Sequence, residues 1–213
     1  MTERGRRQAR RDAASVPFVG LTGGIGAGKS TALAALERLG AATLSTDEVV
    51  HRLYETGEVA ALVTERFGPE VAVPGTHPPV VDRAALATRA FATTADREWL
   101  EQLLWPRVGE AVAAWRARRQ DADPPPRALV VETPLLFESG VDRGYDATIA
   151  VVADEQLRRE RAAARGHRAL DERTARQLTQ DEKAQRATYV VVNDGSEADL
   201  ERILSAVLDR LPG

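Results

Sequence analysis

The sequence predicts an α/β protein built on a parallel five-stranded sheet flanked by helices. An apolar run at residues 16–22 leads through a glycine-rich stretch into a segment with helical leucine spacing at residues 29–39. Four more apolar runs of strand length follow, at residues 41–45, 127–132, 147–152 and 188–192. Helical segments separate these runs, and such alternation is typical of parallel sheets. A chain of 213 residues has room for one such domain with insertions.

The glycine-rich stretch at residues 23–31 reads GGIGAGKST and fits the phosphate-binding pattern G-x-x-x-x-G-K-S. Glycines let backbone N–H groups surround phosphate oxygens, and the helix that follows adds the positive end of its dipole. We expect Lys29 to reach the β- and γ-phosphates of ATP and the Ser30 hydroxyl to ligate Mg²⁺. The expected nucleotide-binding residues are Gly24, Ile25, Gly26, Ala27, Gly28, Lys29, Ser30 and Thr31. The alternative is a glycine-rich turn that only caps a strand.

Lysine is rare in this chain, which uses arginine for nearly every basic side chain. The two lysines are Lys29 and Lys183. A compact ammonium on a flexible stem suits a phosphate loop, whereas a planar guanidinium does not. The retention of lysine at position 29 therefore favours a chemical role there.

Composition excludes several classes of function. The net charge of −3 lacks the basic excess of a nucleic-acid-binding surface. No apolar run approaches the ~20 residues of a membrane span. The absence of cysteine excludes disulfides and thiol catalysis, and it fits a reducing cytoplasm. We expect residues 1–16 to form a disordered Arg-rich leader, with a polyanion-binding arm as the alternative. The sequence does not indicate an oligomeric state.

Two carboxylates follow predicted strands at the edge of the sheet where ligands collect. Asp47 follows the run at residues 41–45, with Thr46 as the expected N-cap of a helix at residues 47–54, so Asp47 should face the same crevice as Lys29. Asp47 could also simply complement the dipole of its helix. Glu132 ends the run at residues 127–132, where P-loop enzymes keep an acid near the metal, or it is a simple strand-end carboxylate.

Two insertions in the core are predicted to carry the rest of the site. Residues 49–126 form the predicted acceptor-binding helical insertion, in which Pro106 should start a new helix or kink the old one. Most of the apolar residues of this long helical run are expected to be core, and they are Trp99, Leu103, Val108, Val112 and Trp115. Asp82 is expected to cap the helix that precedes the run.

The second insertion, residues 154–187, is rich in arginine. Arg161 and Arg165 lie four residues apart, so they share a helix face. Such a cluster is typical of a lid that closes on phosphates, although neighbouring acids leave an ordinary solvated helix as the alternative.

The predicted domain spans residues 17–213, and its core is residues 17–48, 127–153 and 188–213, ending in a helix at residues 197–211.

These features together favour a P-loop kinase fold acting on a small molecule. A regulatory GTPase would carry D-x-x-G and N-K-x-D patterns, which this chain lacks, and motor or helicase ATPases are longer. An acceptor-binding insertion with an arginine lid is what nucleoside monophosphate kinases have.

The motifs resemble those of dephospho-CoA kinases over residues 17–205. Residues 20–30 (GLTGGIGAGKS) are similar to the opening of that family. The P-L-L-F-E run at residues 134–138 matches its signature unchanged, and S-T-D at residues 45–47 is similar to its D-A-D. The remaining landmarks are Asp82-Arg83, Arg161 with Arg165, and the N-D-G turn at residues 193–195.

The resemblance implies ATP-dependent phosphorylation of the 3′-hydroxyl of dephospho-CoA, the last step of CoA biosynthesis, with Mg²⁺. The residues that it implies, together with those above, are Lys29, Asp47, Arg161 and Arg165 for catalysis, Asn193 and Gly195 near the adenine, Ser30 and Glu132 for the metal, and Asp47, Arg83, Pro134, Leu135, Leu136 and Glu138 for the acceptor. The chain departs from the family at Ser45, Trp105 and Thr188, and the lid glutamine is either Gln177 or Gln180. Another small-molecule kinase and a non-catalytic ATP-gated binding protein are the alternatives.

Overall fold

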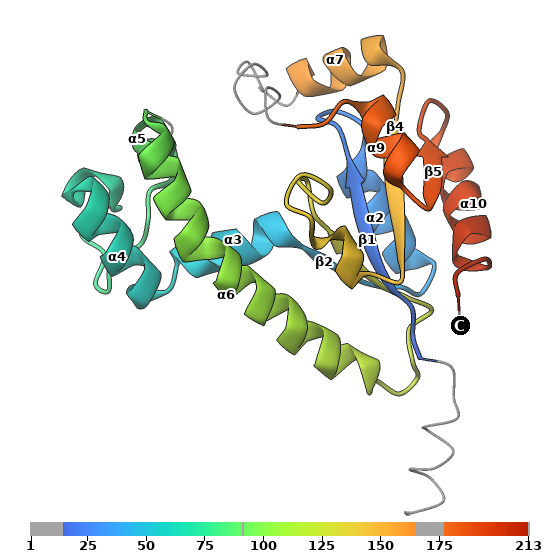
Figure 1. Ribbon diagram of the computed structural model, residues 1–213, viewed down its shortest axis with the longest axis horizontal. Coiled ribbons are helices and arrows are strands. Elements are labelled where there is room, and N and C mark those ends of the chain that lie inside the picture. Colours follow the sequence, from blue (N-terminus) through green and yellow to red (C-terminus); the bar gives the residue numbers. More distant parts are fainter. Residues whose placement is uncertain (1–14, 91, 165–176, 213) are drawn as a thin grey trace, which may run out of the picture. The chain divides into compact units, whose positions relative to one another are not determined.

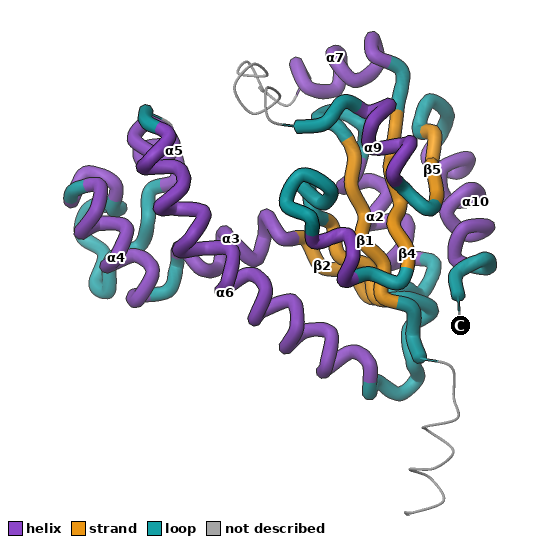
Figure 2. Tube along the Cα trace, in the orientation of Figure 1, coloured by secondary structure: helices purple, strands orange, loops and turns teal. Residues whose placement is uncertain are grey.

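The computed structural model describes residues 15–90, 92–164 and 177–212. The chain divides into two compact units. One unit holds the residues before Ser45 and those from Arg116 onward, and the other runs from Ser45 to Trp115. Figure 1 follows the chain from blue at the N-terminal end to red at the C-terminus, and Figure 2 separates its helices from its strands.

The described part of the chain forms one parallel sheet of five strands, as predicted. The strands are β1 (Phe18–Gly23), β2 (Ala42–Ser45), β3 (Leu129–Glu132), β4 (Ala147–Val152) and β5 (Tyr189–Val192). Their order is β2-β3-β1-β4-β5, so β1 lies between β3 and β4. Every residue of β1 and β3 is buried, which explains why both read as continuous apolar runs. In the register of β1 and β3, Leu21 lies opposite Glu132.

Helices cover both faces of this sheet. They are α2 (Lys29–Arg38), α9 (Gln180–Arg186) and α10 (Glu197–Leu208), and the same unit also contains α7 (Glu155–Ala164) and the short turn η2 (Val141–Gly144). Leu36 of α2 and Leu204 of α10 share one hydrophobic cluster with Leu21 of β1, and Figure 1 shows α10 alongside β5. Because side chains alternate along a strand, Thr22 points to the opposite face, where it contacts Lys183 of α9. Helix α9 therefore packs on the face opposite α2 and α10.

The second unit is helical and has its own hydrophobic cluster. It contains α3 (Thr46–Tyr54), α4 (Gly57–Phe67), η1 (Pro69–Val71), α5 (Arg83–Ala90) and most of α6 (Thr94–Gln120). The ring of Phe67 meets Trp99 edge-on at 5.6 Å between centroids. Asp82 Oδ1 accepts hydrogen bonds from the N–H groups of Ala84 (2.9 Å) and Ala85 (3.1 Å). The prediction that Asp82 caps this helix is confirmed.

Of the two outcomes predicted for Pro106, the start of a new helix is not observed, since Pro106 lies inside one continuous helix, α6. A proline cannot donate to the carbonyl four residues earlier, here that of Gln102. Both residues are exposed, so water can satisfy this carbonyl and the helix continues. Of the five apolar residues expected as core, Trp115 is buried, and Trp99, Leu103, Val108 and Val112 are partly buried.

Two helix ends also differ from the predictions. Helix α3 begins at Thr46, and its N-cap is Ser45 and not Thr46. Ser45 keeps the extended backbone of β2 (φ −101°, ψ 127°), so the strand passes into the helix without a loop. Helix α10 ends at Leu208 instead of Leu211. The Arg210 N–H donates to the carbonyl of Val207 only three residues earlier (3.0 Å), and Pro212 disfavours helical conformation in Leu211, so the helix does not reach Leu211.

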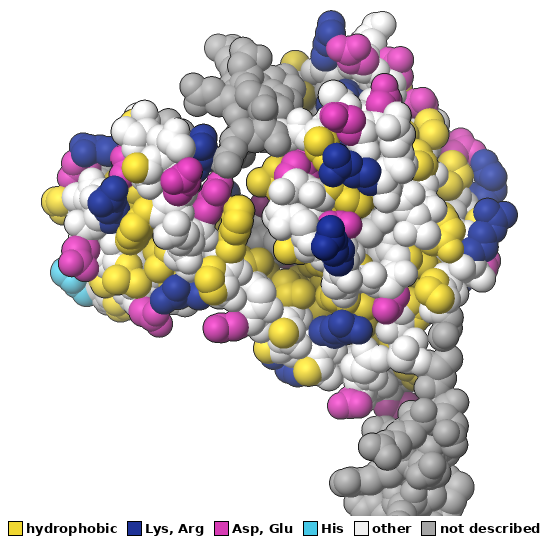
Figure 3. Space-filling view, in the orientation of Figure 1, with side chains coloured by type: hydrophobic (Ala, Val, Ile, Leu, Met, Phe, Trp, Pro, Cys, Tyr) yellow, Lys and Arg dark blue, Asp and Glu magenta, His cyan; other side chains and the backbone are white. Residues whose placement is uncertain are grey.

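The surface mixes both signs of charge. Figure 3 shows basic and acidic side chains interspersed on the face in view. Exposed pairs such as Arg38–Glu201, at 2.9 Å, contribute little to stability, so the hydrophobic clusters are its main source. Within residues 15–90, 92–164 and 177–212, no helix is both long and apolar enough to cross a membrane.

Candidate active site

The predicted phosphate loop connects β1 to α2 and is held in shape by its own backbone. Gly26 (φ 77°) and Gly28 (φ 92°) adopt left-handed conformations that favour glycine. The N–H of Ala27 donates to the carbonyl of Gly24 (3.2 Å). Lys29 Nζ donates to the same carbonyl (3.2 Å), so the side chain folds back over the loop. The strand, loop and helix context expected for a phosphate site is therefore present.

The turn after β5 closes directly on the loop. Asn193 is buried, and its Nδ2 donates to the carbonyl of Ala27 (2.9 Å). A Cβ on Gly28 would collide with this Nδ2, so the close approach requires glycine there. Gly195 lies two residues further along this turn. The structure thus brings Asn193, predicted from the family resemblance, against the loop predicted from its glycines.

Helix α7 supplies two arginines to the same region. Arg161 Nη1 donates to the carbonyl of Asn193 (3.0 Å). Arg158 Nε donates to the carbonyl of Ile25 within the loop (3.0 Å). Arg161 was predicted as a lid residue, whereas Arg158 was not selected. Arg165, its predicted partner, lies outside the described residues.

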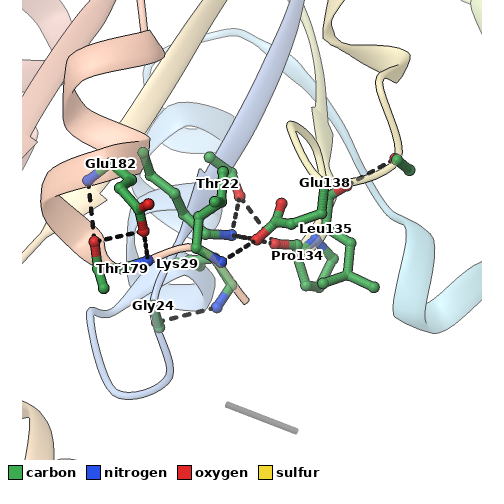
Figure 4. A network of polar contacts seen from close by, with 11 residues as sticks. Thr22, Gly24, Lys29, Pro134, Leu135, Glu138, Thr179 and Glu182 are labelled. Atoms are coloured by element: carbon green, nitrogen blue, oxygen red, sulfur yellow. Dashed lines mark hydrogen bonds and ion pairs between the residues drawn. The ribbon is translucent and has the colours of Figure 1, made fainter. Parts of the chain in front are cut away.

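The 134–138 turn follows β3 on the face covered by α9. Its first carbonyl, that of Pro134, accepts a hydrogen bond from the Thr22 hydroxyl (3.2 Å). Leu136 is fully buried, with its methyl groups 3.0 and 3.1 Å from where a Cβ on Gly20 would lie. Glu138 Oε1 accepts the N–H of Leu178 (2.8 Å). Figure 4 shows Thr22, Pro134 and Glu138 directed toward one another.

Lys183 of α9 lies at the centre of this group, and its side chain has no exposed surface. Its ammonium contacts the Pro134 carbonyl (2.5 Å), the Glu138 carboxylate (3.0 Å) and the Thr22 hydroxyl (3.3 Å). Burial lowers the pKa of Lys183 below its ordinary value, while the negative charges of Glu138 and Glu132 act in the opposite direction.

Sequence reasoning passed over Arg158 and Lys183, although each had a detectable signal. Arg158 lies three residues before Arg161, hence on the same helix face. Lys183 is the second of two lysines in an arginine-rich chain, and the argument that singled out Lys29 applied to it equally. What the sequence lacked was the position of α9 over the end of β1.

The predicted metal ligand Glu132 is the last residue of β3 and is 7% exposed.

The predicted lid glutamine is either Gln177 or Gln180. Gln180 holds the end of β4 through both atoms of its amide, since Oε1 accepts the N–H of Ala153 (2.9 Å) and Nε2 donates to the carbonyl of Ala153 (2.8 Å). This contact anchors the start of α9 to the residue that follows β4.

Two predicted site residues belong to the second unit. Asp47 is exposed in the first turn of α3, next to Glu48. Arg83 is the first residue of α5, and its Nη1 lies 3.3 Å from Nδ1 of His51. Trp105, which departs from the family pattern, is 52% exposed. The roles of Asp47 and Arg83 stay predictions.

A central parallel strand that leads through a glycine loop into a helix is common to P-loop proteins, and the structural comparisons place this fold in the class of P-loop kinases. The crystal structure of TT1252 from Thermus thermophilus matches with a TM-score of 0.75 and 35% identity, covering 93% of this chain and 100% of that one. A dephospho-CoA kinase structure from Campylobacter jejuni shares the fold at a TM-score of 0.64 and 24% identity, covering 92% and 96%.

The sequence comparisons narrow this class. The family profile described as dephospho-CoA kinase matches residues 17–199. Dephospho-CoA kinase of Deinococcus radiodurans is 40% identical over 199 residues, which is 91% of each chain. That of Symbiobacterium thermophilum is 37% identical over 183 residues, 84% of this chain and 74% of the relative. This chain belongs to the dephospho-CoA kinase family.

Proposed function

We propose that this protein transfers the γ-phosphoryl group of ATP to the 3′-hydroxyl of dephospho-CoA, in the cytoplasm. The observation that carries the proposal is the family match over residues 17–199, which includes the phosphate loop and the 134–138 turn. In the reaction, the bond between the γ-phosphorus and the bridging oxygen breaks and a bond to the 3′-oxygen forms. ADP and CoA leave, and the hydroxyl proton passes to a base.

The loop would hold ATP through its backbone N–H groups and Lys29. Asn193 and Gly195 would border the adenine. The left-handed glycines at positions 26 and 28 support this role, because a Cβ there would collide with the Arg158 carbonyl and the Asn193 amide, which pack closely against the loop. Arg161 and Arg165 would neutralise the charge that spreads over the equatorial oxygens during transfer.

Mg²⁺ fits the residues present. Within the described ranges, no group of three or more His, Cys, Asp or Glu side chains is placed to hold a metal by itself. Mg²⁺ is usually bound by one or two carboxylates together with substrate phosphates and water, and such a site needs no cage of protein ligands. Ser30 and Glu132 would hold the ion, whose charge would offset that of the β- and γ-phosphates.

Acceptor binding is proposed for residues of the 134–138 turn and for Arg83. Pro134, Leu135, Leu136 and Glu138 are the proposed acceptor residues of the turn, and Arg83 is that of the second unit. Asp47 would orient the 3′-hydroxyl and accept its proton. Asp47 is exposed in the first turn of α3, so its carboxylate is accessible to a bound acceptor.

Release of ADP from ATP in the presence of different acceptors tests this function. We expect turnover with dephospho-CoA, and little with AMP or CMP. Preferential turnover with AMP or CMP would make the protein a nucleoside monophosphate kinase. ATP binding without acceptor-dependent ADP release would make it an ATP-gated binding protein.

A further inference from the structure

Lys183 is a buried basic residue to which the proposed reaction assigns no role. It is the largest of the fully buried side chains in the described residues. Burying an ammonium costs several kcal/mol unless its partners compensate, and an apolar side chain of similar volume is often equally stable or better. Hydrophobic packing alone therefore does not account for a lysine on this face of α9.

The partners of Lys183 match its three N–H donors. They are the carbonyl of Pro134, the carboxylate of Glu138 and the hydroxyl of Thr22. The Thr22 hydroxyl in turn donates to the Pro134 carbonyl (3.2 Å). Thr22 thus accepts a hydrogen bond from the ammonium and donates one to another partner of the same ammonium. One charged group thus joins three segments that are distant in sequence.

These three segments all border the proposed reaction site. Thr22 directly precedes Gly23, where the loop sequence begins. Pro134 and Glu138 are the two ends of the 134–138 turn, and Lys183 contacts both of them as well as Thr22 of β1. Glu138 Oε1 also accepts the N–H of Leu178, just before α9. The other carboxylate oxygen, Oε2, is buried and has no hydrogen-bond partner in the described structure, so Oε1 alone fixes this carboxylate.

We propose that Lys183 is a positioning residue that fixes the 134–138 turn against the end of β1 and thereby sets the affinity for the acceptor. The proposal rests on the proposed function, in which this turn binds dephospho-CoA. ATP binding has separate supports, because the contacts of Lys29 with Gly24 and of Asn193 with Ala27 do not include Lys183. Loss of Lys183 should therefore affect the acceptor and spare the donor.

Lys183→Met tests this separation, since methionine keeps an unbranched chain without the charge. We expect the KM for dephospho-CoA to rise about tenfold to a hundredfold, the scale of misplacing a positioning group. The dissociation constant of ATP should stay within about threefold, a small change on the scale where tenfold is 1.4 kcal/mol. Arg186→Met is the matched control, because it removes an exposed basic side chain from the same helix and should change neither constant.

Chemical restoration of the ammonium separates positioning from simple stability. Because the chain has no cysteine, Lys183→Cys can be alkylated with 2-bromoethylamine at one site while unfolded, and then refolded. This places an ammonium at nearly the original length. We expect the KM for dephospho-CoA to return toward the wild-type value, while alkylation with iodoacetamide leaves it high. This experiment also decides the matter if Lys183→Met fails to fold.

Two results would overturn the proposal. One is a Lys183→Met protein with a wild-type KM for dephospho-CoA. The other is an equal loss of affinity for ATP and for the acceptor, which returns after alkylation with bromoethylamine only if the melting temperature returns as well. That pattern would mean that Lys183 has a structural role alone. Both results presuppose turnover of dephospho-CoA by the wild-type protein. Absence of that turnover would instead refute the proposed function, so the two failures are distinguishable.

Discussion

Gly28 is a position where the backbone and a neighbouring side chain both require glycine. Its φ of 92° is left-handed, and a Cβ would collide with Asn193 Nδ2. Gly28→Ala should therefore weaken ATP binding at least about tenfold, since moving Asn193 breaks its hydrogen bond to Ala27. Titration with a fluorescent ATP analogue measures the effect.

Gly75→Ala is the matched control for this substitution. Gly75 has a similar φ of 77°, but nothing lies within 4 Å of the position of its Cβ. Both variants carry the backbone cost of about 1–2 kcal/mol for a left-handed L-residue. Equal ATP affinity in the two variants would show that the contact with Asn193 is irrelevant to nucleotide binding.

Substitutions at Asp47 and Glu48 test whether Asp47 acts as a catalytic base or only interacts with the helix dipole. Both are exposed acids in the first turn of α3, so both interact favourably with the helix dipole. We expect Asp47→Asn to lower kcat by about a hundredfold or more, the usual scale of general base catalysis, with little change in ATP binding. Glu48→Gln should leave kcat within about twofold, since a dipole contribution alone is below ~1 kcal/mol. Similar kcat values for the two variants would remove Asp47 from the mechanism.

At the scale of the elements, α9 depends on a capping box at its N-terminus. The Thr179 hydroxyl accepts the N–H of Glu182 (3.2 Å), and the Glu182 carboxylate accepts the N–H of Thr179 (2.8 Å). Thr179→Ala should lower the free energy of unfolding by about 1 kcal/mol. Urea denaturation measures this loss. Ser196→Ala removes the equivalent cap of α10 and should cost a similar amount. No loss in Thr179→Ala would mean that packing alone sets the start of α9.

The same capping box gives a pH dependence with a defined sign. The hydrogen bond from the Thr179 backbone N–H is the main cause that lowers the pKa of Glu182 below its ordinary 4.5. The folded state thus favours the charged carboxylate, so its contribution to stability is complete above pH 4.5 and is lost as the pH falls through the lower folded value. The stability difference between wild-type and Glu182→Gln proteins should shrink over this acidic window.

Most elements could be predicted from the sequence because each carries a local signal. Buried strands such as β4 are continuous apolar runs, and the prediction of residues 147–152 was correct at both ends. The sequence was less decisive where surroundings override a local rule. A proline often ends a helix, but the exposure of Pro106 and Gln102 to solvent permits α6 to continue. Ser45 caps α3 because β2 delivers it already extended.

The site residues could be predicted only where they belong to a short sequence motif. The glycine loop and Asn193 appear as short patterns, and the structure brings them into contact. The network around Lys183 has no such pattern, since its three partners lie 49, 161 and 45 positions away along the chain and meet only through the packing of α9 on the sheet. Contacts of this kind depend on tertiary structure, which a single sequence does not display.

At the scale of the whole molecule, the proposed site residues divide between two compact units with separate hydrophobic clusters. The loop that we propose for ATP belongs to the first unit, whereas Asp47 and Arg83 belong to the second. Binding of ATP alone should therefore act on the first cluster. Hydrogen exchange in saturating ATP is expected to protect amides around Leu21 and Leu36 more than those around Val63.

Binding of ATP at the loop should raise the melting temperature of the whole chain, and this rise should depend on Lys29. A ligand that binds only the folded state stabilises it by about 2.7 kcal/mol at 100 times its dissociation constant. For a chain of this size, such a gain raises Tm by roughly 5–10 °C. Lys29→Ala should abolish turnover and most of this rise, because the variant lacks the ammonium proposed to hold the phosphates. Arg38→Ala removes an exposed basic side chain from the other end of α2 and should keep both. If Lys29→Ala showed the full ATP-dependent rise in Tm, the nucleotide would bind somewhere other than this loop.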